Sequence, residues 1–289
     1  MTRGPGPPTA SMTLRLGWFS TGGGEGSQRQ RLLTATVDLI RQGDMDAEIA
    51  FVFCNRERGE QQATDSFLNL AESYSIPCIT YSSRQFRRDR GGARSQPGQP
   101  LPPWRAEYDA EVAKLIAEHP FDVGVLIGYM LIFTPEMSAR YPFINLHPAA
   151  PSGPVGTWQQ VIWELIDHRT KHSGVMVHLA TAELDRGPVV SYCTFSLHGE
   201  VLDPLWDGIG DAPADQLRED TGEEHPLFQE IRREGAAREV PAVIATLQAL
   251  AQGRVRVENN QVVDARGKAM PGGLDLTSDV EAAVTKTQS

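Results

Sequence analysis

Short apolar segments that alternate with helical stretches constrain the fold of this chain more than any other feature. The clearest segment is FDVGVLIG at 121–128, which is apolar at nearly every position, as expected of a strand covered on both faces. Patterns typical of helices occur at 27–41 and 61–74. Further apolar runs lie at 14–20, 49–54, 76–81 and 143–146. This alternation predicts an α/β fold with a Rossmann-like, mostly parallel sheet and helices on both faces.

The pattern changes after residue 147, where strands no longer alternate regularly with helices. Two helices and two strands are expected, at 157–168, 174–180, 188–197 and 227–251. A small hairpin is expected at 254–263, because Asn259 and Asn260 suit a tight turn. These elements predict a small helical and hairpin extension at the C-terminal end of the domain.

Composition along the chain suggests where the domain begins and ends. Residues 1–12, rich in Pro, Gly and Thr, are expected to be a disordered leader, with no resemblance to a signal peptide. A single catalytic domain is expected at 13–271. It carries an arginine-rich insertion at 83–103 and an acidic, irregular insertion at 202–223. Residues 272–289 are expected to be a flexible tail.

Charge and cysteine usage narrow the classes of partner. A net charge of −10 disfavours non-specific binding of nucleic acid, so small-molecule substrates are expected. Three cysteines without CxxC spacing fit a reduced, cytoplasmic protein. No apolar stretch reaches the length of a membrane span, and we expect a monomer or homodimer. His168 and His172 flank charged residues, which indicates a solvated helix end, and no metal site is expected.

A glycine-rich turn at 22–27 lies between the first apolar run and the first helix. Its backbone amides and the helix N-terminus favour an anion site, such as one for a substrate phosphate. Dinucleotide binding is disfavoured, because Ser27 replaces the third glycine and Asn55 stands where an acid would hold a ribose. A tight turn without a ligand is the alternative.

Asn145 and His147 end a predicted strand and are two residues apart, so their side chains share one face. Ligands of open parallel sheets bind at the carboxyl ends of the strands, where this amide and imidazole would project together. Asp185 lies in a turn between two later strands and has a functional role only if it approaches His147 in space. A turn-capping aspartate is the alternative. His178 is either a site-lining residue or a hydrogen-bonded core histidine.

The motifs IGYMLIF, INLHP and GVMVHLATAELDRGP, in this order, resemble the folate-dependent formyltransferases. The similarity runs from about residue 14 to residue 271 and is strongest between 122 and 190. It implies transfer of a formyl group from the co-substrate 10-formyltetrahydrofolate to an amine, without a metal. Within the family, the resemblance is greatest to members that formylate glycinamide ribonucleotide in purine biosynthesis.

The resemblance also implies roles for particular residues. Asn145, His147 and Asp185 match the catalytic trio of the family, and Arg84 matches an arginine near the glutamate tail of the folate. The residues matching those that hold the pterin are Tyr129, Met130, Leu131 and Ile132. The residues matching the acceptor's contacts are Gly26, Ser27 and Gln28 at its phosphate and Glu224 at its ribose hydroxyls.

The loop at 149–156 departs from the family pattern, which leaves the acceptor open. An amino sugar nucleotide is one alternative. Water, as in a formyltetrahydrofolate hydrolase, is another, although the N-terminal regulatory domain of that enzyme has no room before Leu14. A non-catalytic folate- or nucleotide-binding homologue also remains open. Formylation of initiator tRNA is disfavoured, because residues 202–289 are acidic rather than basic.

Overall fold

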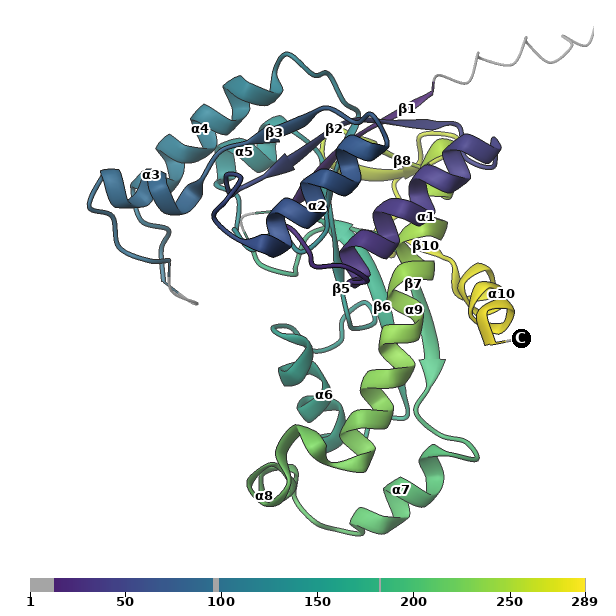
Figure 1. The fold of residues 1–289 in the computed structure, drawn as a ribbon. Coiled ribbons are helices and arrows are strands. Elements are labelled where there is room, and N and C mark those ends of the chain that lie inside the picture. Colours follow the sequence, from purple (N-terminus) through teal and green to yellow (C-terminus); the bar gives the residue numbers. More distant parts are fainter. Residues whose placement is uncertain (1–12, 96–98, 182, 289) are drawn as a thin grey trace, which may run out of the picture.

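The computed structural model of the chain describes residues 13–95, 99–181 and 183–288. Its centre is an eight-stranded sheet, with the strands in the order β10-β7-β6-β5-β4-β1-β2-β3 (Figure 1). These strands are β1 (Leu14–Ser20), β2 (Ala47–Cys54), β3 (Cys78–Thr80), β4 (Val123–Leu126), β5 (Phe143–His147), β6 (His172–Leu179), β7 (Val189–Ser196) and β10 (Leu274–Asp275). The expected Rossmann-like α/β fold is therefore confirmed.

The sheet is parallel from β3 to β5, and antiparallel pairing begins where β6 joins β5. β7 pairs antiparallel with β6, and β10 returns parallel to β7. A separate hairpin joins β8 (Val255–Glu258) to β9 (Gln261–Asp264), with Asn259 and Asn260 at positive φ as tight hairpin turns require. The hairpin was expected at these residues.

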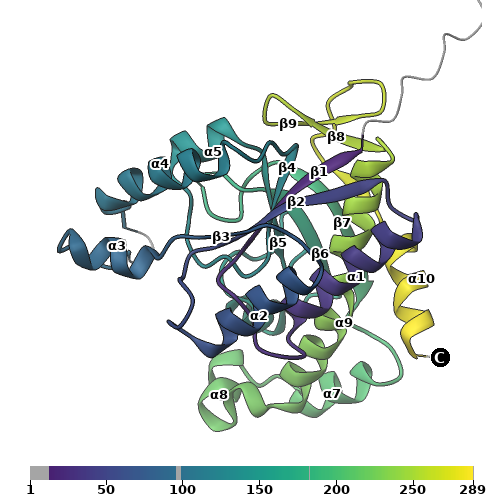
Figure 2. The ribbon, with the colours of Figure 1, turned by 45° about the horizontal axis from the view of Figure 1, so that its top comes forward.

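Helices cover both faces of the sheet (Figure 2). They are α1 (Gln28–Gln42), α2 (Gln62–Ser73), α3 (Ser83–Asp89), α4 (Trp104–Ile116), α5 (Pro135–Arg140), α6 (Trp158–Asp167), α7 (Leu202–Ile209), α8 (Ala214–Asp220), α9 (Pro226–Ala251) and α10 (Thr277–Gln288). None of these described helices is long and apolar enough to cross a membrane.

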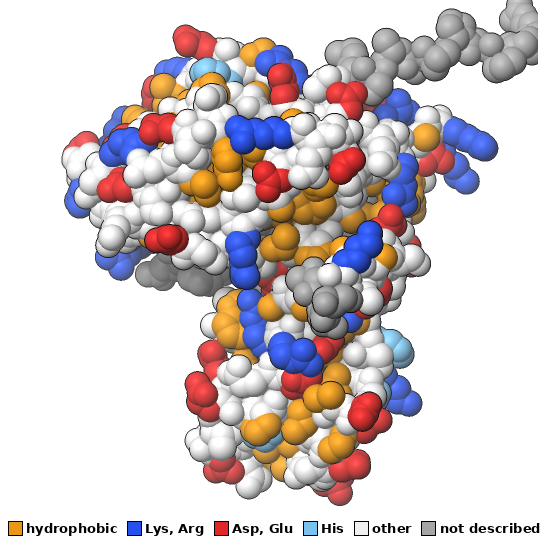
Figure 3. Space-filling view, turned by 45° about the vertical axis from the view of Figure 1, so that its right-hand side comes forward, with side chains coloured by type: hydrophobic (Ala, Val, Ile, Leu, Met, Phe, Trp, Pro, Cys, Tyr) orange, Lys and Arg blue, Asp and Glu red, His pale blue; other side chains and the backbone are white. Residues whose placement is uncertain are grey.

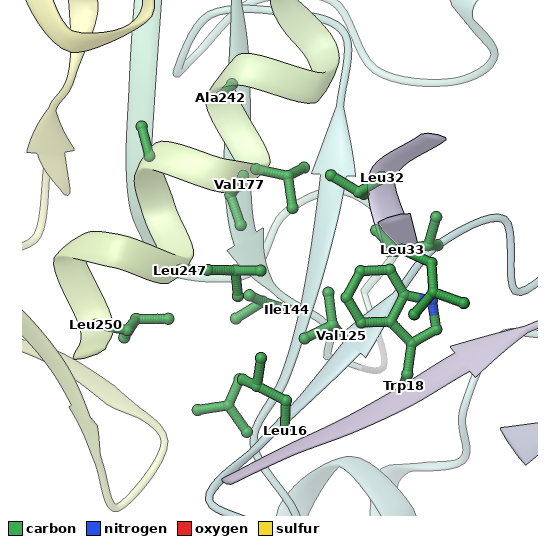
Figure 4. Packing of buried hydrophobic residues seen from close by; sticks show 14 of the residues in the cluster. Leu16, Trp18, Leu32, Leu33, Val125, Ile144, Val177, Ala242, Leu247 and Leu250 are labelled. Carbon is green, nitrogen blue, oxygen red and sulfur yellow. The ribbon is translucent and has the colours of Figure 1, made fainter. Parts of the chain in front are cut away.

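Alternating side chains of β1 divide the core between the two faces. Trp18 belongs to one buried cluster with Leu33 of α1, Ile144 of β5 and Leu247 of α9 on one face (Figure 4). Phe19 points to the other face, where α4 and α5 cover a cluster of aromatic rings. Because both residues are fully buried, β1 lies at the centre of the fold, as its apolar sequence predicts.

A second, narrower lobe extends from the sheet and is built by α6, α7, α8 and the first half of α9 (Figures 1 and 3). The expectation of an irregular insertion at 202–223 is wrong, because Leu202, Trp206 and Ile209 recur at helical spacing and are buried in this lobe. Their contacts stabilise α7 despite the acidic residues around them.

Three further predictions concern the insertion at 83–103, the tail at 272–289 and the leader at 1–12. The arginine-rich insertion begins with helix α3, which Ser82 caps by accepting from the Gln85 amide. Residues 277–288, expected as part of a flexible tail, form α10, because Val280 and Val284 are buried in the main core. The leader expected at 1–12 lies outside the described residues.

Candidate active site

Strand β5 places Asn145 and His147 at the edge of the sheet where the parallel strands end. In the antiparallel pairing with β6, Asn145 lies opposite His178 and His147 lies opposite Met176. Parallel pairing with β4 ends at Asn145, so this residue lies beside the segment that leaves β4 at Ile127. The centroids of the His147 and His178 rings are 6.5 Å apart. Pairing between β5 and β6 thus brings His178 next to the predicted pair of Asn145 and His147.

Asp185 reaches these histidines from the turn between β6 and β7, where its backbone adopts a positive φ of 55°. Its Oδ2 lies 3.6 Å from His147 Nδ1, and its Oδ1 lies 3.6 Å from His178 Nε2. Both distances exceed a normal hydrogen bond but are within ion-pair range. The approach of Asp185 to His147, which the chain's spacing left open, is therefore present in the structure.

The electrostatic surroundings of Asp185 favour its ionised form. Burial alone would raise the pKa of its carboxyl group, whose side chain is only 9% exposed. His178 and His147, together with the backbone of Gly156, outweigh burial and hold that pKa below its ordinary value. Asp185 is therefore a negative charge held between two imidazoles.

The other nitrogens of the two histidines contact backbone carbonyls. His147 Nε2 lies 2.8 Å from the oxygen of Pro154, in the loop that departs from the family pattern. His178 Nδ1 lies 3.0 Å from the oxygen of Leu179. Because a carbonyl only accepts, each of these nitrogens carries a proton. The nitrogen of each ring that remains, Nδ1 of His147 and Nε2 of His178, faces Asp185.

Two cavities, each of about 360 Å³, meet at Asn145. Both are also lined by Leu126, Tyr129 and Met130, which belong to the end of β4 and the segment after it. His178 and Asp185 line only the second cavity. The amide of Asn145 is therefore placed where ligands in the two cavities would approach one another.

Most residues that line the second cavity are apolar or aromatic, and five of them form the segment 129–133. A buried ion pair on α4 holds this segment in place. Arg105 Nη2 donates to the oxygen of Ile132 at 2.7 Å and lies 3.2 Å from Asp109 Oδ1, while Asp109 Oδ2 accepts from the Thr134 amide at 2.7 Å. The two charged side chains are 1% and 2% exposed. Residues expected to hold the pterin, Tyr129 to Ile132, thus share one cavity on a rigid support.

The first cavity has a polar wall formed by α1 and α9. Gln28 Nε2 donates to Glu239 Oε2 at 2.5 Å, and the other oxygen of Glu239 accepts from Arg232. Arg29 also lines this cavity and donates to the oxygen of Gly22. Burial lowers the pKa of Arg29. A cation, a carboxylate and an amide thus face the same space.

The glycine-rich turn leads directly into this wall. Gly26 has a φ of 69°, and a Cβ there would meet no atom within 4 Å. Ser27 caps α1 by accepting from the amide of Gln30. The turn therefore presents an open backbone at the N-terminus of α1, immediately before Gln28.

Glu224 is a predicted site residue that the structure does not bring to the others. It lies exposed in a 3₁₀ turn, Gly222–Glu224, of the narrow lobe, and it lines neither cavity. The carboxylate at the first cavity is Glu239, which the sequence reasoning missed. The feature that could have identified Glu239 is an acidic residue among the buried positions of α9, close to Ala242 and Val243.

Arg84 lines a third cavity, next to the second. Among the residues that the structure describes, no group of three or more His, Cys, Asp or Glu side chains is arranged to hold a metal ion.

The sequence pattern of the formyl transferase family matches residues 24–196, more than half of the chain, so the chain belongs to this family. It is 29% identical over 168 residues to the phosphoribosylglycinamide formyltransferase of Dictyostelium discoideum, covering 55% of this chain and 74% of that protein. It is 27% identical over 179 residues to the formyltetrahydrofolate deformylase of Haemophilus influenzae, covering 57% of this chain and 54% of that protein.

Solved structures confirm the fold. A phosphoribosylglycinamide formyltransferase from Coxiella burnetii superposes with a TM-score of 0.59 at 19% identity, covering 91% of this chain and 99% of that one. A formyltetrahydrofolate deformylase from Pseudomonas syringae gives a TM-score of 0.55 at 21% identity, covering 88% and 66%. The match of the family pattern to residues 24–196 confirms the family resemblance inferred from the sequence motifs.

Proposed function

We propose that this formyl transferase moves a formyl group from 10-formyltetrahydrofolate to the amine of glycinamide ribonucleotide. The observation that carries the proposal is the position of Asn145 where two cavities meet, with Asp185 lining one of them and lying 3.6 Å from His147. Relatives named phosphoribosylglycinamide formyltransferase, including that of Dictyostelium discoideum, support this choice of acceptor.

In the proposed reaction, the acceptor amine attacks the formyl carbon and forms a new C–N bond. The carbonyl electron pair moves to oxygen, and the Asn145 amide donates a hydrogen bond to the resulting oxyanion. Asp185, acting through water, helps move the proton from the attacking amine to N10 of the folate. Collapse of the tetrahedral intermediate then breaks the bond between the formyl carbon and N10, and no enzyme side chain becomes covalently attached.

His147 contributes positive charge to this step when both of its nitrogens are protonated. Asp185 faces Nδ1 and the Pro154 carbonyl accepts from Nε2, and both partners suit a doubly protonated ring. For the ring itself to donate to the oxyanion, the contact with Pro154 must open. The loop 149–156 therefore influences the reaction through the orientation of this imidazole.

The second cavity fits the folate ring system. Its volume and mainly apolar lining are typical of sites for flat heteroaromatic ligands, and Asp185 and His178 stand at its polar end. The residues proposed to hold the pterin are Tyr129, Met130, Leu131 and Ile132. Donor and acceptor would then meet at Asn145.

The first cavity is proposed to bind the acceptor. The backbone of Gly26, Ser27 and Gln28 at the N-terminus of α1 supplies an anion site for the phosphate. Glu239 is proposed to accept hydrogen bonds from the ribose hydroxyls, in the role first assigned to Glu224. Small molecules are thus the proposed partners, without nucleic acid, and the state as a monomer or homodimer stays a prediction. Cys54, Cys78 and Cys193 are free thiols, which supports a cytoplasmic location.

Hydrolysis is the second candidate, because the chain also resembles formyltetrahydrofolate deformylases. In that reaction, Asp185 would activate water instead of an amine. The polar wall formed by Gln28, Arg29 and Glu239 favours the amine acceptor, since water needs no such recognition surface.

Variants at the proposed catalytic residues test the chemistry at saturating donor. Asn145→Ala is expected to lower turnover by about 10²–10³, the usual effect of losing one oxyanion donor. Asp185→Asn is also expected to lower turnover, because it removes the carboxylate that helps to move the proton. Asp203→Asn is a matched control, because Asp203 contacts His198 at 2.8 Å but both are exposed in the narrow lobe. Full turnover by Asn145→Ala would refute the proposed mechanism.

A further inference from the structure

Glu239, the carboxylate of the first cavity, has its counter-charge outside that cavity. The Glu239 side chain is only 7% exposed, and a carboxylate buried to this extent is costly unless it is paired. Arg232 lies two helical turns earlier on the same face of α9, and its Nη1 donates to Glu239 Oε1 at 2.5 Å. Arg232 does not line the first cavity itself. Any effect of Arg232 on a ligand in the cavity therefore passes through Glu239.

A stacking contact fixes the guanidinium of Arg232 from another side. Its central carbon lies 4.6 Å from the centroid of the Trp158 ring, a distance at which an arginine is attracted to the face of an aromatic ring. Trp158 is the first residue of α6, and a capping box of Thr157 and Gln160 closes the N-terminus of this helix. The loop 149–156 leads directly into the cap. The helix that follows this loop thus holds the cation that pairs with the acceptor wall.

The contacts of Glu239 leave a defined part of its carboxylate for a ligand. Gln28 Nε2 donates to Oε2 at 2.5 Å and Arg232 donates to Oε1, so each oxygen has one of these protein donors. An ionised carboxylate offers about four acceptor positions, two on each oxygen. The remaining positions suit two hydroxyl groups on neighbouring carbons of a sugar. Because each oxygen is already held by a side chain, the plane of the carboxylate is set before the ligand binds.

We propose that Arg232 is a positioning residue for the acceptor: it neutralises Glu239 and fixes the plane in which this carboxylate accepts from the paired hydroxyls of a ribose. This inference rests on the proposed function, because it requires the acceptor ribose to occupy the first cavity. The neighbouring Arg233 has other partners, since it contacts Glu230 at 2.5 Å and Glu234 at 2.8 Å and is 56% exposed. Selection of a ribose is thus strengthened by a residue that does not touch it.

The test is the steady-state kinetics of Arg232→Gln with glycinamide ribonucleotide and with an analogue whose ribose lacks the 2- and 3-hydroxyls. The variant is expected to raise the KM for the ribonucleotide about tenfold, the usual effect of losing one hydrogen bond to a charged group. The kcat and the KM for the folate should be kept, because Arg232 lines neither the first nor the second cavity. The kcat/KM for the analogue should not change, because the analogue has no hydroxyls for Glu239 to bind.

Arg233→Gln is the matched control and should behave as the wild type with both acceptors, because Arg233 belongs to the same helix but does not contact Glu239. In an enzyme that already carries Glu239→Gln, the change Arg232→Gln should have no further effect, since Arg232 acts through that carboxylate. If Arg232→Gln does not fold, Arg232→Lys takes its place, because it keeps the positive charge and loses only the planar guanidinium. It should raise the same KM by a smaller factor.

Three results would overturn the inference while leaving formyl transfer in place. They are an unchanged KM for the ribonucleotide, an equal loss of kcat/KM with both acceptors, and additive effects of the substitutions at 232 and 239. An equal loss with both acceptors would show a general structural role for Arg232. Failure of the wild type to formylate the ribonucleotide at all would instead refute the proposed function itself.

Discussion

The buried ion pair on α4 gives the sharpest prediction, for the variant Asp109→Ala. Asp109 neutralises Arg105 and accepts from the Thr134 amide, while Arg105 holds the Ile132 carbonyl. Burial raises the pKa of Asp109, and Arg105 together with Thr134 opposes that effect. Removing the carboxylate leaves a guanidinium that is 1% exposed without its counter-charge.

The expected cost of Asp109→Ala is about 3–5 kcal/mol in the free energy of unfolding, since one partner of a buried pair remains uncompensated. The total free energy of unfolding of a typical domain is about 5–15 kcal/mol, so the variant would lose a large share of its stability. Asp109→Asn keeps an oxygen for the Thr134 amide and loses only the charge. It should therefore be affected less.

Urea denaturation measures both variants against Glu107→Ala, a control on the same helix. Glu107 pairs with Arg90 at the surface and is 58% exposed, so its loss should cost about 1 kcal/mol or less. Folate binding to Asp109→Asn should also weaken, because the supported segment lines the cavity proposed to bind the donor. If Asp109→Ala is no less stable than Glu107→Ala, the buried pair does not hold this segment as argued.

Two further predictions concern Glu239, which lines the first cavity, and Asp185, which lines the second. Glu239→Gln should raise the KM for the acceptor and leave the KM for the donor unchanged, because Glu239 lines only the first cavity; a shift in the donor KM alone would contradict its placement. The folded-state pKa of Asp185 is lowered, so its ionised carboxylate stabilises the folded protein. This contribution is complete above the ordinary carboxyl pKa of about 4 and is lost as the pH falls through the folded-state pKa. The stability difference between wild type and Asp185→Asn should therefore shrink on acidification from about pH 6 to pH 3 in denaturation experiments, and a difference that grows would show the wrong sign.

Much of the fold could be predicted because the buried strands are almost wholly apolar. The expected and observed ends of β1 coincide at residues 14 and 20, and Asn145 and His147 lie at the predicted strand end. The helix α7 was missed because Leu202, Trp206 and Ile209 are interspersed with Asp, Pro and Gly. Their burial within the narrow lobe shows that this spacing forms the apolar face of a helix.

The candidate site shows a similar division. Asp185 could be singled out by its motif, but its distance from His147 depends on the pairing of β6 with β5, which no local pattern specifies. Glu224 resembled a family residue in sequence, whereas Glu239 reaches the cavity because α9 packs against α1. The position of a helix in space decided which glutamate faces the site.

The most direct test of the central claim is spectroscopic measurement of 10-formyltetrahydrofolate consumption, with and without glycinamide ribonucleotide. We predict that the folate is deformylated only when the ribonucleotide is present, and that the formylated ribonucleotide accumulates in equal amount. Consumption at the same rate without the ribonucleotide would instead show hydrolysis and contradict the proposed acceptor.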